Sequence, residues 1–201
     1  MTAPIVVKLG GSLAEAGSIR SWLAVLTAGG AGRCVVVPGG GVFADAVRGA
    51  QPVFGFSDGA AHEMALLAMA QYGLLLADLA PILVPAETEV AIAAGLSRHR
   101  IPLWLPSHMV VAAPEIAPGW DITSDSLAAW LAGKIGASAL ILVKSVKPPS
   151  EAASPAEMAR AGLVDPAFPR FTGGAAFTVA CCGPGDEARL EARLGAGSGL
   201  G

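Results

Sequence analysis

Charged residues are scarce in this 201-residue chain. They make up 14% of it, and the 16 acidic residues outnumber the 13 lysines and arginines. A formal net charge of −3 provides no basic surface for nucleic acid or anionic lipid, so we expect neither kind of partner. Hydrophobic residues make up 53% of the chain instead, a content typical of a sheet buried on both faces.

Features of secreted, membrane and zinc proteins are also missing. No basic segment precedes the first apolar run, and Lys8 interrupts that run, which argues against a signal peptide. The longest apolar stretch, residues 65–86, contains a glutamine, an aspartate and a proline that lipid tolerates poorly. The three cysteines, Cys34, Cys181 and Cys182, lack metal-ligand spacing and are expected to stay reduced. We therefore expect a cytoplasmic protein that is not inserted in a membrane.

Short β-branched runs alternate with helical patterns, which predicts an α/β fold with a mainly parallel sheet. The predicted strands are residues 5–9, 33–37, 82–84, 101–105, 139–143 and 175–180. The predicted helices are residues 18–28, 42–49, 59–77, 87–95, 124–135 and 186–194. Continuously apolar strands suit a sheet covered on both faces, so the expected architecture is a three-layer αβα sandwich. Residues 148–172 contain five prolines and are predicted to form a surface loop with a single helical turn.

The first candidate anion site follows the first predicted strand, in the sequence Lys8-Leu9-Gly10-Gly11-Ser12. Glycines let backbone N–H groups approach an anion closely, and Lys8 adds a positive charge. Open parallel sheets bind ligands at the carboxyl ends of their strands, which is where this loop lies. The pattern favours a phosphate-binding loop, and an ordinary turn with a partly exposed lysine is the alternative.

A second glycine loop, Gly39-Gly40-Gly41, also follows a predicted strand and precedes a helix. Gly39, Gly41 and Ala44 match the dinucleotide fingerprint G-x-G-x-x-A. That fingerprint needs an acidic residue at the end of the next strand, about twenty residues further on, and no convincing strand precedes Asp58. A second ligand loop is therefore a better interpretation than a nicotinamide-dependent dehydrogenase.

A third cluster, Thr123-Ser124-Asp125, opens an apolar helix. These residue types cap helices and complement the helix dipole, which is a sufficient structural reason for them. A functional reading is compatible with capping: the helix amino terminus presents N–H groups to an anion while Asp125 orients a nearby lysine. Other enzyme motifs are incomplete, because Gly133-Lys134 lacks the rest of a Walker A loop and His62-Glu63 lacks the second histidine of a zinc site.

Together these segments resemble the amino acid kinase superfamily, whose members transfer the γ-phosphoryl group of ATP to a carboxylate, carbamate or phosphate. The similarity spans most of the chain and rests on residues 8–12, 39–41, 123–129 and 140–146. It implies one kinase-like domain over residues 1–201, with an acceptor-side half of about 1–115 and a nucleotide-side half of about 116–201. It also implies a small-molecule substrate and a homo-oligomer.

The resemblance implies the following roles. Lys8 and Asp125 are catalytic, with Asp125 holding Lys8 in register. The residues expected to bind ATP are Lys8, Gly10, Gly11, Ser12, Lys144, Ser145 and Lys147. Those expected to bind the acceptor are Gly39, Gly40, Gly41, Asp58, Thr123 and Ser124. Mg²⁺ would be held mainly by the nucleotide, with no metal ligand from the protein. Lys144 and Lys147 replace acidic residues common in the family, so solvated loop lysines are the alternative for both.

Residues 120–126 and 143–146, with the short chain, look most like the kinases of methanofuran-type cofactor synthesis. That resemblance implies an aminomethylfuran methyl phosphate as acceptor. The alternatives are isopentenyl phosphate, a nucleoside monophosphate, an amino acid carboxylate, or a noncatalytic nucleotide-binding relative. Phe54 and Phe56 beside Asp58 suit a small ring with a cationic amine, and burial in the core is the alternative for both phenylalanines.

Overall fold

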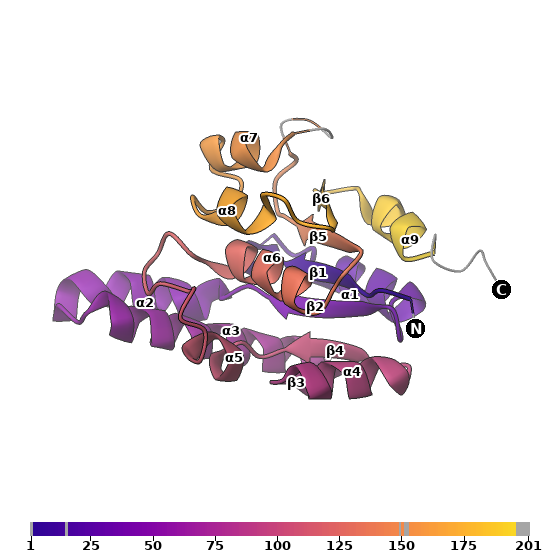
Figure 1. The fold of residues 1–201 in the computed structure, drawn as a ribbon, viewed down its shortest axis with the longest axis horizontal. Helices are drawn as coiled ribbons and strands as arrows, with labels where there is room; N and C mark the ends of the chain where they lie inside the picture. Colours follow the sequence, from indigo (N-terminus) through magenta and orange to yellow (C-terminus); the bar gives the residue numbers. More distant parts are fainter. Residues whose placement is uncertain (1, 15, 149, 151–152, 196–201) are drawn as a thin grey trace.

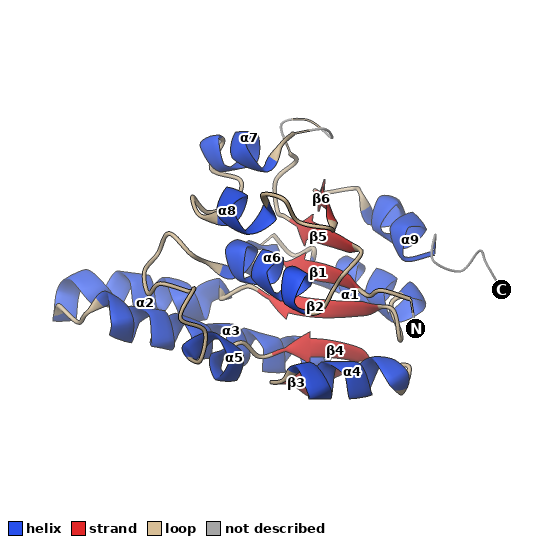
Figure 2. Ribbon diagram, in the orientation of Figure 1, coloured by secondary structure: helices blue, strands red, loops and turns tan. Residues whose placement is uncertain are grey.

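The computed structural model describes residues 2–14, 16–148, 150 and 153–195. Within them, the centre is a six-stranded sheet in the order β3-β4-β2-β1-β5-β6, with every neighbouring pair parallel (Figures 1 and 2). The strands are β1 Ile5–Leu9, β2 Cys34–Pro38, β3 Leu83–Ala86, β4 Ile101–Trp104, β5 Ala139–Val143 and β6 Thr178–Cys182. The predicted α/β fold with a parallel sheet is confirmed.

Helices connect successive strands and cover both faces of the sheet (Figure 2). They are α1 Ile19–Gly29, α2 Gly41–Phe54, α3 Asp58–Leu79, α4 Glu89–Ser97, α5 Ser107–Val111, α6 Ser124–Lys134, α7 Pro155–Arg160, α8 Phe168–Thr172 and α9 Glu187–Gly195. A short 3-10 helix, η1 Gly11–Leu13, follows β1.

Strand side chains alternate between two hydrophobic cores. Val6 and Leu140 point to the face that carries α6 and α8, where they pack with residues such as Phe168. Val7 and Ile141 point to the opposite face, where α1, α9 and part of α3 lie. Both faces of the sheet are thus covered, which confirms the predicted three-layer sandwich and explains the continuously apolar strands.

The proline-rich segment 148–172 is not the surface loop predicted from its composition. It contains α7 and α8, and its Met158 and Phe168 side chains are 3% and 0% exposed. Pro155 and Pro169 both lie in the first turn of a helix, where a missing N–H costs no hydrogen bond. These two prolines therefore mark helix starts.

Helix α2 is longer than predicted, because it continues past Gly49 and through Pro52 before Gly55 ends it. Gly55 has a φ of 69°, the left-handed conformation that glycine adopts readily at a helix end. The extension matters for the site, since it carries Gln51 past the strand ends. Strand β6 begins at Thr178, three residues later than predicted, and α5 was not predicted.

Helix α3 is long and apolar enough, by length and composition, to cross a membrane. In the structure its Tyr72 and Leu76 side chains are buried in the second core. A core helix of a globular fold meets the same criteria, so the composition of α3 does not by itself indicate a membrane span.

Burial raises the pKa of the Cys34 thiol to about 12 and that of Cys181 to about 11, so both thiols stay protonated at neutral pH.

The strand order creates a switch point beside β1. The chain passes from β1 to β2 on one side, and later reaches β5 on the other side. The connections that follow β1 and β5 therefore lead to opposite sides of the sheet, and open parallel sheets bind ligands in the crevice at such a switch point. Helix α2 begins at the carboxyl end of β2 and extends away from the sheet with α3 beside it, which places the first turn of α2 next to the crevice (Figure 1).

Candidate active site

Three charged side chains meet where β1, β5 and α6 converge. The Lys8 ammonium lies 2.8 Å from Oδ1 of Asp125, and the Lys144 ammonium lies 2.7 Å from Oδ2. The side chains of Lys8, Asp125 and Lys144 are only 5%, 7% and 12% exposed. One carboxylate thus holds two buried cations side by side, and one positive charge remains unbalanced within this cluster.

The pKa values of Asp125 and Lys144 follow from this arrangement. Burial works against the Asp125 carboxylate, but the charges of Lys8 and Lys144 outweigh it and hold its pKa below the usual range. Burial and repulsion from Lys8 lower the pKa of Lys144 to about 8, although Asp125 opposes them. Lys144 is therefore still a cation at neutral pH, and it loses its proton as the pH rises through about 8.

The two glycine loops lie back to back. A Cβ built on Gly11 would be 2.3 Å from the backbone nitrogen of Gly41, and a Cβ on Gly39 would be 2.4 Å from the nitrogen of Gly11. Gly41 also has a φ of 52°, which side-chain-bearing residues rarely adopt. Any larger residue at these positions would force the loops apart. Glycine is needed here for a close approach of two backbones.

The sheet itself uses some of the amides that the sequence assigned to phosphate. The N–H of Gly10 donates to the Val143 carbonyl at 3.0 Å, and that of Gly39 donates to the Leu9 carbonyl at 2.8 Å. Gly10 and Gly39 therefore extend the strand pairing by one bond each. Their contribution to the loops is their small size.

Ser12 and Ser145 come together from the loops after β1 and β5, with their hydroxyl oxygens 2.8 Å apart. The structure thus brings these two predicted nucleotide-binding residues to one place beside the lysine pair. Lys147 lies further along the same loop and is exposed, with its backbone against Gly183. Lys144 thus lies within the charge cluster, whereas the Lys147 side chain is exposed.

The first turn of α6 is capped by a distant carboxylate. Asp165, located between α7 and α8, accepts through Oδ2 from the Thr123 N–H at 3.0 Å, the Thr123 hydroxyl at 2.8 Å and the Ser126 N–H at 3.0 Å. The Ser126 hydroxyl donates to the other oxygen of Asp165. Thr123 holds the N-cap position, but its side chain makes no cap bond. The expectation that the 123–125 cluster caps its own helix is therefore corrected.

A cavity of about 220 Å³ opens between the glycine loops and the start of α6. Its walls include most of the predicted acceptor residues and several unpredicted ones. The lining residues are Gly11, Ser12, Gly40, Gly41, Ala44, Asp45, Arg48, His62, Ala65, Leu66, Met69, Gly119, Trp120, Ile122, Thr123, Ser124 and Leu127.

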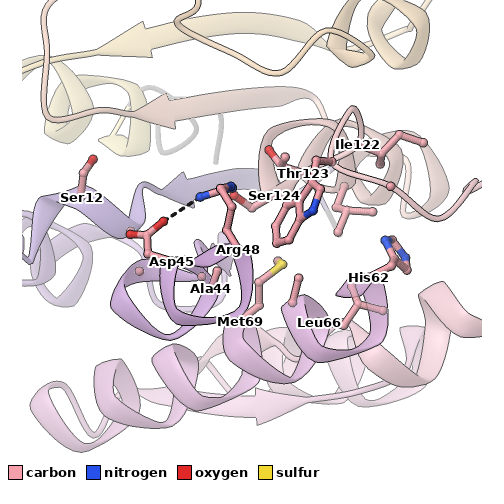
Figure 3. Close-up of a pocket in the computed structure, with 17 residues that line it drawn as sticks. Ser12, Ala44, Asp45, Arg48, His62, Leu66, Met69, Ile122, Thr123 and Ser124 are labelled. Atoms are coloured by element: carbon pink, nitrogen blue, oxygen red, sulfur yellow. Dashed lines mark hydrogen bonds and ion pairs between the residues drawn. The ribbon is translucent and has the colours of Figure 1, made fainter. Parts of the chain in front are cut away.

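Figure 3 shows the polar side chains of this cavity. Arg48 and Asp45 reach from α2 toward Thr123 and Ser124, joined by an ion pair of 2.7 Å. Burial lowers the pKa of His62, against smaller opposing effects from Glu63 and the Gly119 backbone, so this imidazole is neutral at pH 7. The cavity thus offers one guanidinium, one carboxylate and one neutral imidazole.

Asp58, Phe54 and Phe56 do not line the cavity. The Asp58 carboxylate accepts a hydrogen bond from Nε2 of Gln51 at 2.8 Å, and Phe54 is 78% exposed. Phe54 is therefore part of neither the core nor the cavity. Asp58 is linked to the cavity wall through Gln51, because Oε1 of Gln51 accepts a hydrogen bond from the indole N–H of Trp120, which lines the cavity.

Sequence reasoning missed Asp45, Arg48 and Asp165. Asp45 and Arg48 follow Gly41 by four and seven residues on α2, which is the spacing of one helix face. That periodicity, projected from the glycine loop, could have identified both. No comparable signal marks Asp165, because its partners lie about forty residues earlier in the chain.

Comparison with known proteins agrees with this geometry. Residues 3–148 match the amino acid kinase family. The chain belongs to this family. Among solved structures, the fold is similar to that of uridylate kinase of Archaeoglobus fulgidus, with a TM-score of 0.70, 19% identity and 95% of each chain covered. UMP kinase of Bacillus anthracis gives a TM-score of 0.71 at 12% identity, covering 95% of this chain and 92% of that one.

In sequence, the chain is similar to the [5-(aminomethyl)furan-3-yl]methyl phosphate kinase of Methanocaldococcus jannaschii. The two are 27% identical over 142 residues, which is 70% of this chain and 65% of the relative. The match therefore spans slightly less than two thirds of that protein's length. The relative's name describes a kinase whose acceptor is already phosphorylated.

Proposed function

We propose that this amino acid kinase family member transfers the γ-phosphoryl group of ATP to a small phosphorylated acceptor. The observation that carries the proposal is the buried Lys8–Asp125–Lys144 cluster beside a cavity floored by two glycine loops. Phosphoryl transfer depends mainly on positioning and on stabilising charge spread over the transferred oxygens. Two fixed ammonium groups and loop amides supply that stabilisation without a covalent nucleophile.

In the proposed reaction, an oxygen of the acceptor phosphate forms a new bond to the γ-phosphorus while the bond to the ADP oxygen breaks. The attacking oxygen is already ionised, so no proton has to be removed. The cavity's carboxylate, Asp45, is paired with Arg48, and its neutral imidazole, His62, is not needed as a general base for such an acceptor. An alcohol acceptor would require such a base.

Mg²⁺ accompanies ATP in this proposal and shields its phosphate oxygens. The described residues contain no group of three histidine, cysteine, aspartate or glutamate side chains able to hold a metal. Both oxygens of Asp125 are engaged by lysines. The residues present therefore fit a Mg²⁺ held by the nucleotide, with Lys8, Lys144 and the loop amides orienting the phosphates.

The size of the cavity favours a small acceptor. Its volume of about 220 Å³ is below the roughly 300–1,000 Å³ typical of pockets for drug-sized ligands. A furan ring with one phosphate fits this volume better than a nucleoside monophosphate does. We therefore propose [5-(aminomethyl)furan-3-yl]methyl phosphate as the acceptor, giving its diphosphate for a methanofuran-type cofactor; the similar M. jannaschii kinase supports this choice.

The test is a coupled ADP-release assay with MgATP and five candidate acceptors. These are the furan phosphate, its unphosphorylated alcohol, isopentenyl phosphate, uridine monophosphate and N-acetylglutamate. We expect the highest kcat/KM with the furan phosphate and negligible ADP with the alcohol. A higher kcat/KM for another phosphate would refute the proposed acceptor but leave the proposed kinase activity standing. Release of no ADP with any acceptor would refute the kinase activity itself.

We also propose that the protein is a cytoplasmic homo-oligomer. Several apolar side chains of α2 and α3 are exposed in the single chain, among them Val53 at 75%, Leu67 at 57% and Leu74 at 55%. A second copy of the chain would remove such side chains from water. Light scattering at micromolar concentration should give a multiple of 20.0 kDa, and a monomer would contradict this part of the proposal.

A further inference from the structure

A side-chain relay crosses from α3 to the wall of the acceptor cavity. The Asp58 carboxylate accepts from Nε2 of Gln51 at 2.8 Å, and Oε1 of Gln51 accepts from the Trp120 indole N–H at 2.7 Å. Of these three residues, only Trp120 lines the cavity. The relay therefore ends on a flat aromatic surface that an acceptor would touch.

Each member of the relay fixes the next. An amide side chain has two distinguishable ends, and Asp58 accepts only from the NH₂ end, so the oxygen of Gln51 must face Trp120. The indole has a single N–H, so this bond sets the rotation of the ring. The NH₂ group of Gln51 also lies 3.4 Å from the Phe56 carbonyl, which supports the same orientation.

A second contact holds the indole in place. The Arg48 guanidinium carbon lies 4.5 Å from the centre of the Trp120 ring, within range of a cation–π interaction. Arg48 is itself paired with Asp45 on the same helix. The Trp120 ring is thus held against α2 in two ways: its N–H edge bonds to Gln51, and one of its faces contacts Arg48.

We infer that Trp120 is a specificity-determining residue that selects acceptors with a planar aromatic ring, and that Gln51 and Asp58 are positioning residues that orient it. The inference rests on the proposed function and adds the property of the acceptor that this site selects. Aromatic rings pack on an indole in offset or edge-on geometry, and a fixed indole would offer the face that Arg48 does not cover at little entropic cost. A branched aliphatic chain gains less from such a surface.

The relay also gives Asp58 a role that differs from direct substrate contact. Its carboxylate is two hydrogen bonds away from the indole. Removing the Asp58 carboxylate, which accepts the hydrogen bond from Gln51, frees Gln51 to rotate. Replacing the carboxylate with an amide keeps an oxygen that can accept this hydrogen bond. Asp58→Asn should therefore behave like the wild type, and Asp58→Ala should resemble a loss of Gln51.

The decisive experiment compares two ligands of equal charge by calorimetry without nucleotide: furan-3-ylmethyl phosphate and isopentenyl phosphate. We expect the wild type to bind the furan ligand roughly five- to tenfold more tightly, in line with the strength of aromatic pairs. Gln51→Met, which removes both relay bonds but keeps the side-chain length, should reduce this preference to about twofold or less. The effect should come from weaker binding of the furan ligand.

The matched control is Gln71→Met, the same substitution at an exposed position of α3 outside the relay. It should retain the full preference. In turnover assays, Gln51→Met should raise the KM of the ring acceptor several-fold, with kcat within about twofold and the KM of MgATP unchanged. A general loss of structure would instead change all three.

The outcomes separate this inference from the proposed function. No preference in the wild type, or an unchanged preference in Gln51→Met, overturns the inference even if the protein releases ADP. A preference that Gln51→Met and Asp58→Ala abolish and Gln71→Met keeps supports it. If no acceptor yields ADP, the kinase proposal fails, and the calorimetric preference still decides the role of Trp120.

Discussion

The candidate active site contains two ion-pair systems in opposite environments. Lys8 and Asp125 are 5% and 7% exposed, whereas Arg48 and Asp45 in the acceptor cavity are 53% and 61% exposed. A buried pair is hard to separate, because either charge alone in the interior is strongly unfavourable. An exposed pair contributes little to stability and exchanges partners easily. The first is suited to a fixed task in every turnover, and the second to a ligand that arrives and leaves.

The same contrast holds for the backbone. On the phosphate side, glycine loops touch each other and leave no space for even one Cβ. On the acceptor side, the wall is made of side chains held by hydrogen bonds and a cation–π contact. We therefore expect substitutions on the phosphate side to change kcat, and those on the acceptor side to change the KM of the acceptor.

The largest expected effect is that of Lys8→Met. Removing one fixed charge donor typically lowers kcat by about 10²–10³. Arg48→Met should instead raise the KM of the acceptor, by about tenfold, with kcat largely kept. Lys134→Met, at a lysine that pairs with Glu89 away from the site, is the control. Equal kcat values for Lys8→Met and the control would contradict the catalytic role of Lys8.

A smaller loss is expected for Asp165→Asn. The amide would present NH₂ to groups that now donate to Asp165, leaving buried donors unpaired at about 1–3 kcal/mol each. We expect Tm to fall by roughly 5–10 °C and kcat by about tenfold, because the start of α6 no longer holds Asp125. The exposed neighbour Asp121, changed to Asn, is the control.

A merely structural role for Asp165 would leave the pH profile unchanged. If Asp165 positions Asp125, then Asp165→Asn weakens the support that Asp125 gives to charged Lys144, and the alkaline limb of kcat/KM moves to lower pH. A lower Tm with an unshifted alkaline limb would show that Asp165 only stabilises the fold.

The smallest effect is a pH dependence from Lys144. Its pKa of about 8 means that the ammonium is lost as pH rises, so kcat/KM should fall to about half its plateau near pH 8. Bound phosphates favour the charged form of Lys144, so the fall in kcat with rising pH should occur at a higher pH than the fall in kcat/KM. Lys144→Arg should remove the limb, because guanidinium does not titrate there. A limb near pH 8 that persists in Lys144→Arg would exclude Lys144 as its source.

Stability should change in the opposite direction with pH. Between about 8 and the ordinary lysine value of 10.5, the unfolded chain binds a proton at Lys144 that the folded chain has released. The contribution of this group to the free energy of unfolding therefore rises with pH in that window. Measuring Tm and kcat/KM on the same samples separates the two effects.

The sequence predicted that Lys8 and Asp125 meet, but it missed Asp45, Arg48 and Asp165, and the difference has a physical reason. Lys8, the glycine loops and the start of α6 lie at strand ends and helix starts, where local sequence determines the geometry. Their convergence follows from a parallel sheet, whose carboxyl ends share one edge. The six strands were recognisable from their short β-branched runs, with the start of β6 displaced by three residues.

The remaining parts depend on tertiary contacts that no local pattern encodes. Asp165 caps a helix about forty residues away, and Gln51 meets Trp120 across 69 residues. Helices α7 and α8 were missed because Pro155 and Pro169 were interpreted as loop residues, although proline is equally typical of a first helical turn. Asp58 was assigned to the acceptor from its position, and only the structure shows Gln51 between it and the cavity wall.

The central claim is that Asp125 organises the two lysines for phosphoryl transfer. The most direct measurement is kcat and Tm of Asp125→Asn, with the acceptor and MgATP saturating. The change keeps the shape of the side chain but removes the charge that holds Lys8 and Lys144 together. We predict a fall in kcat of about 10²-fold or more, with the protein still folded. Wild-type turnover with only a lower Tm would contradict the account.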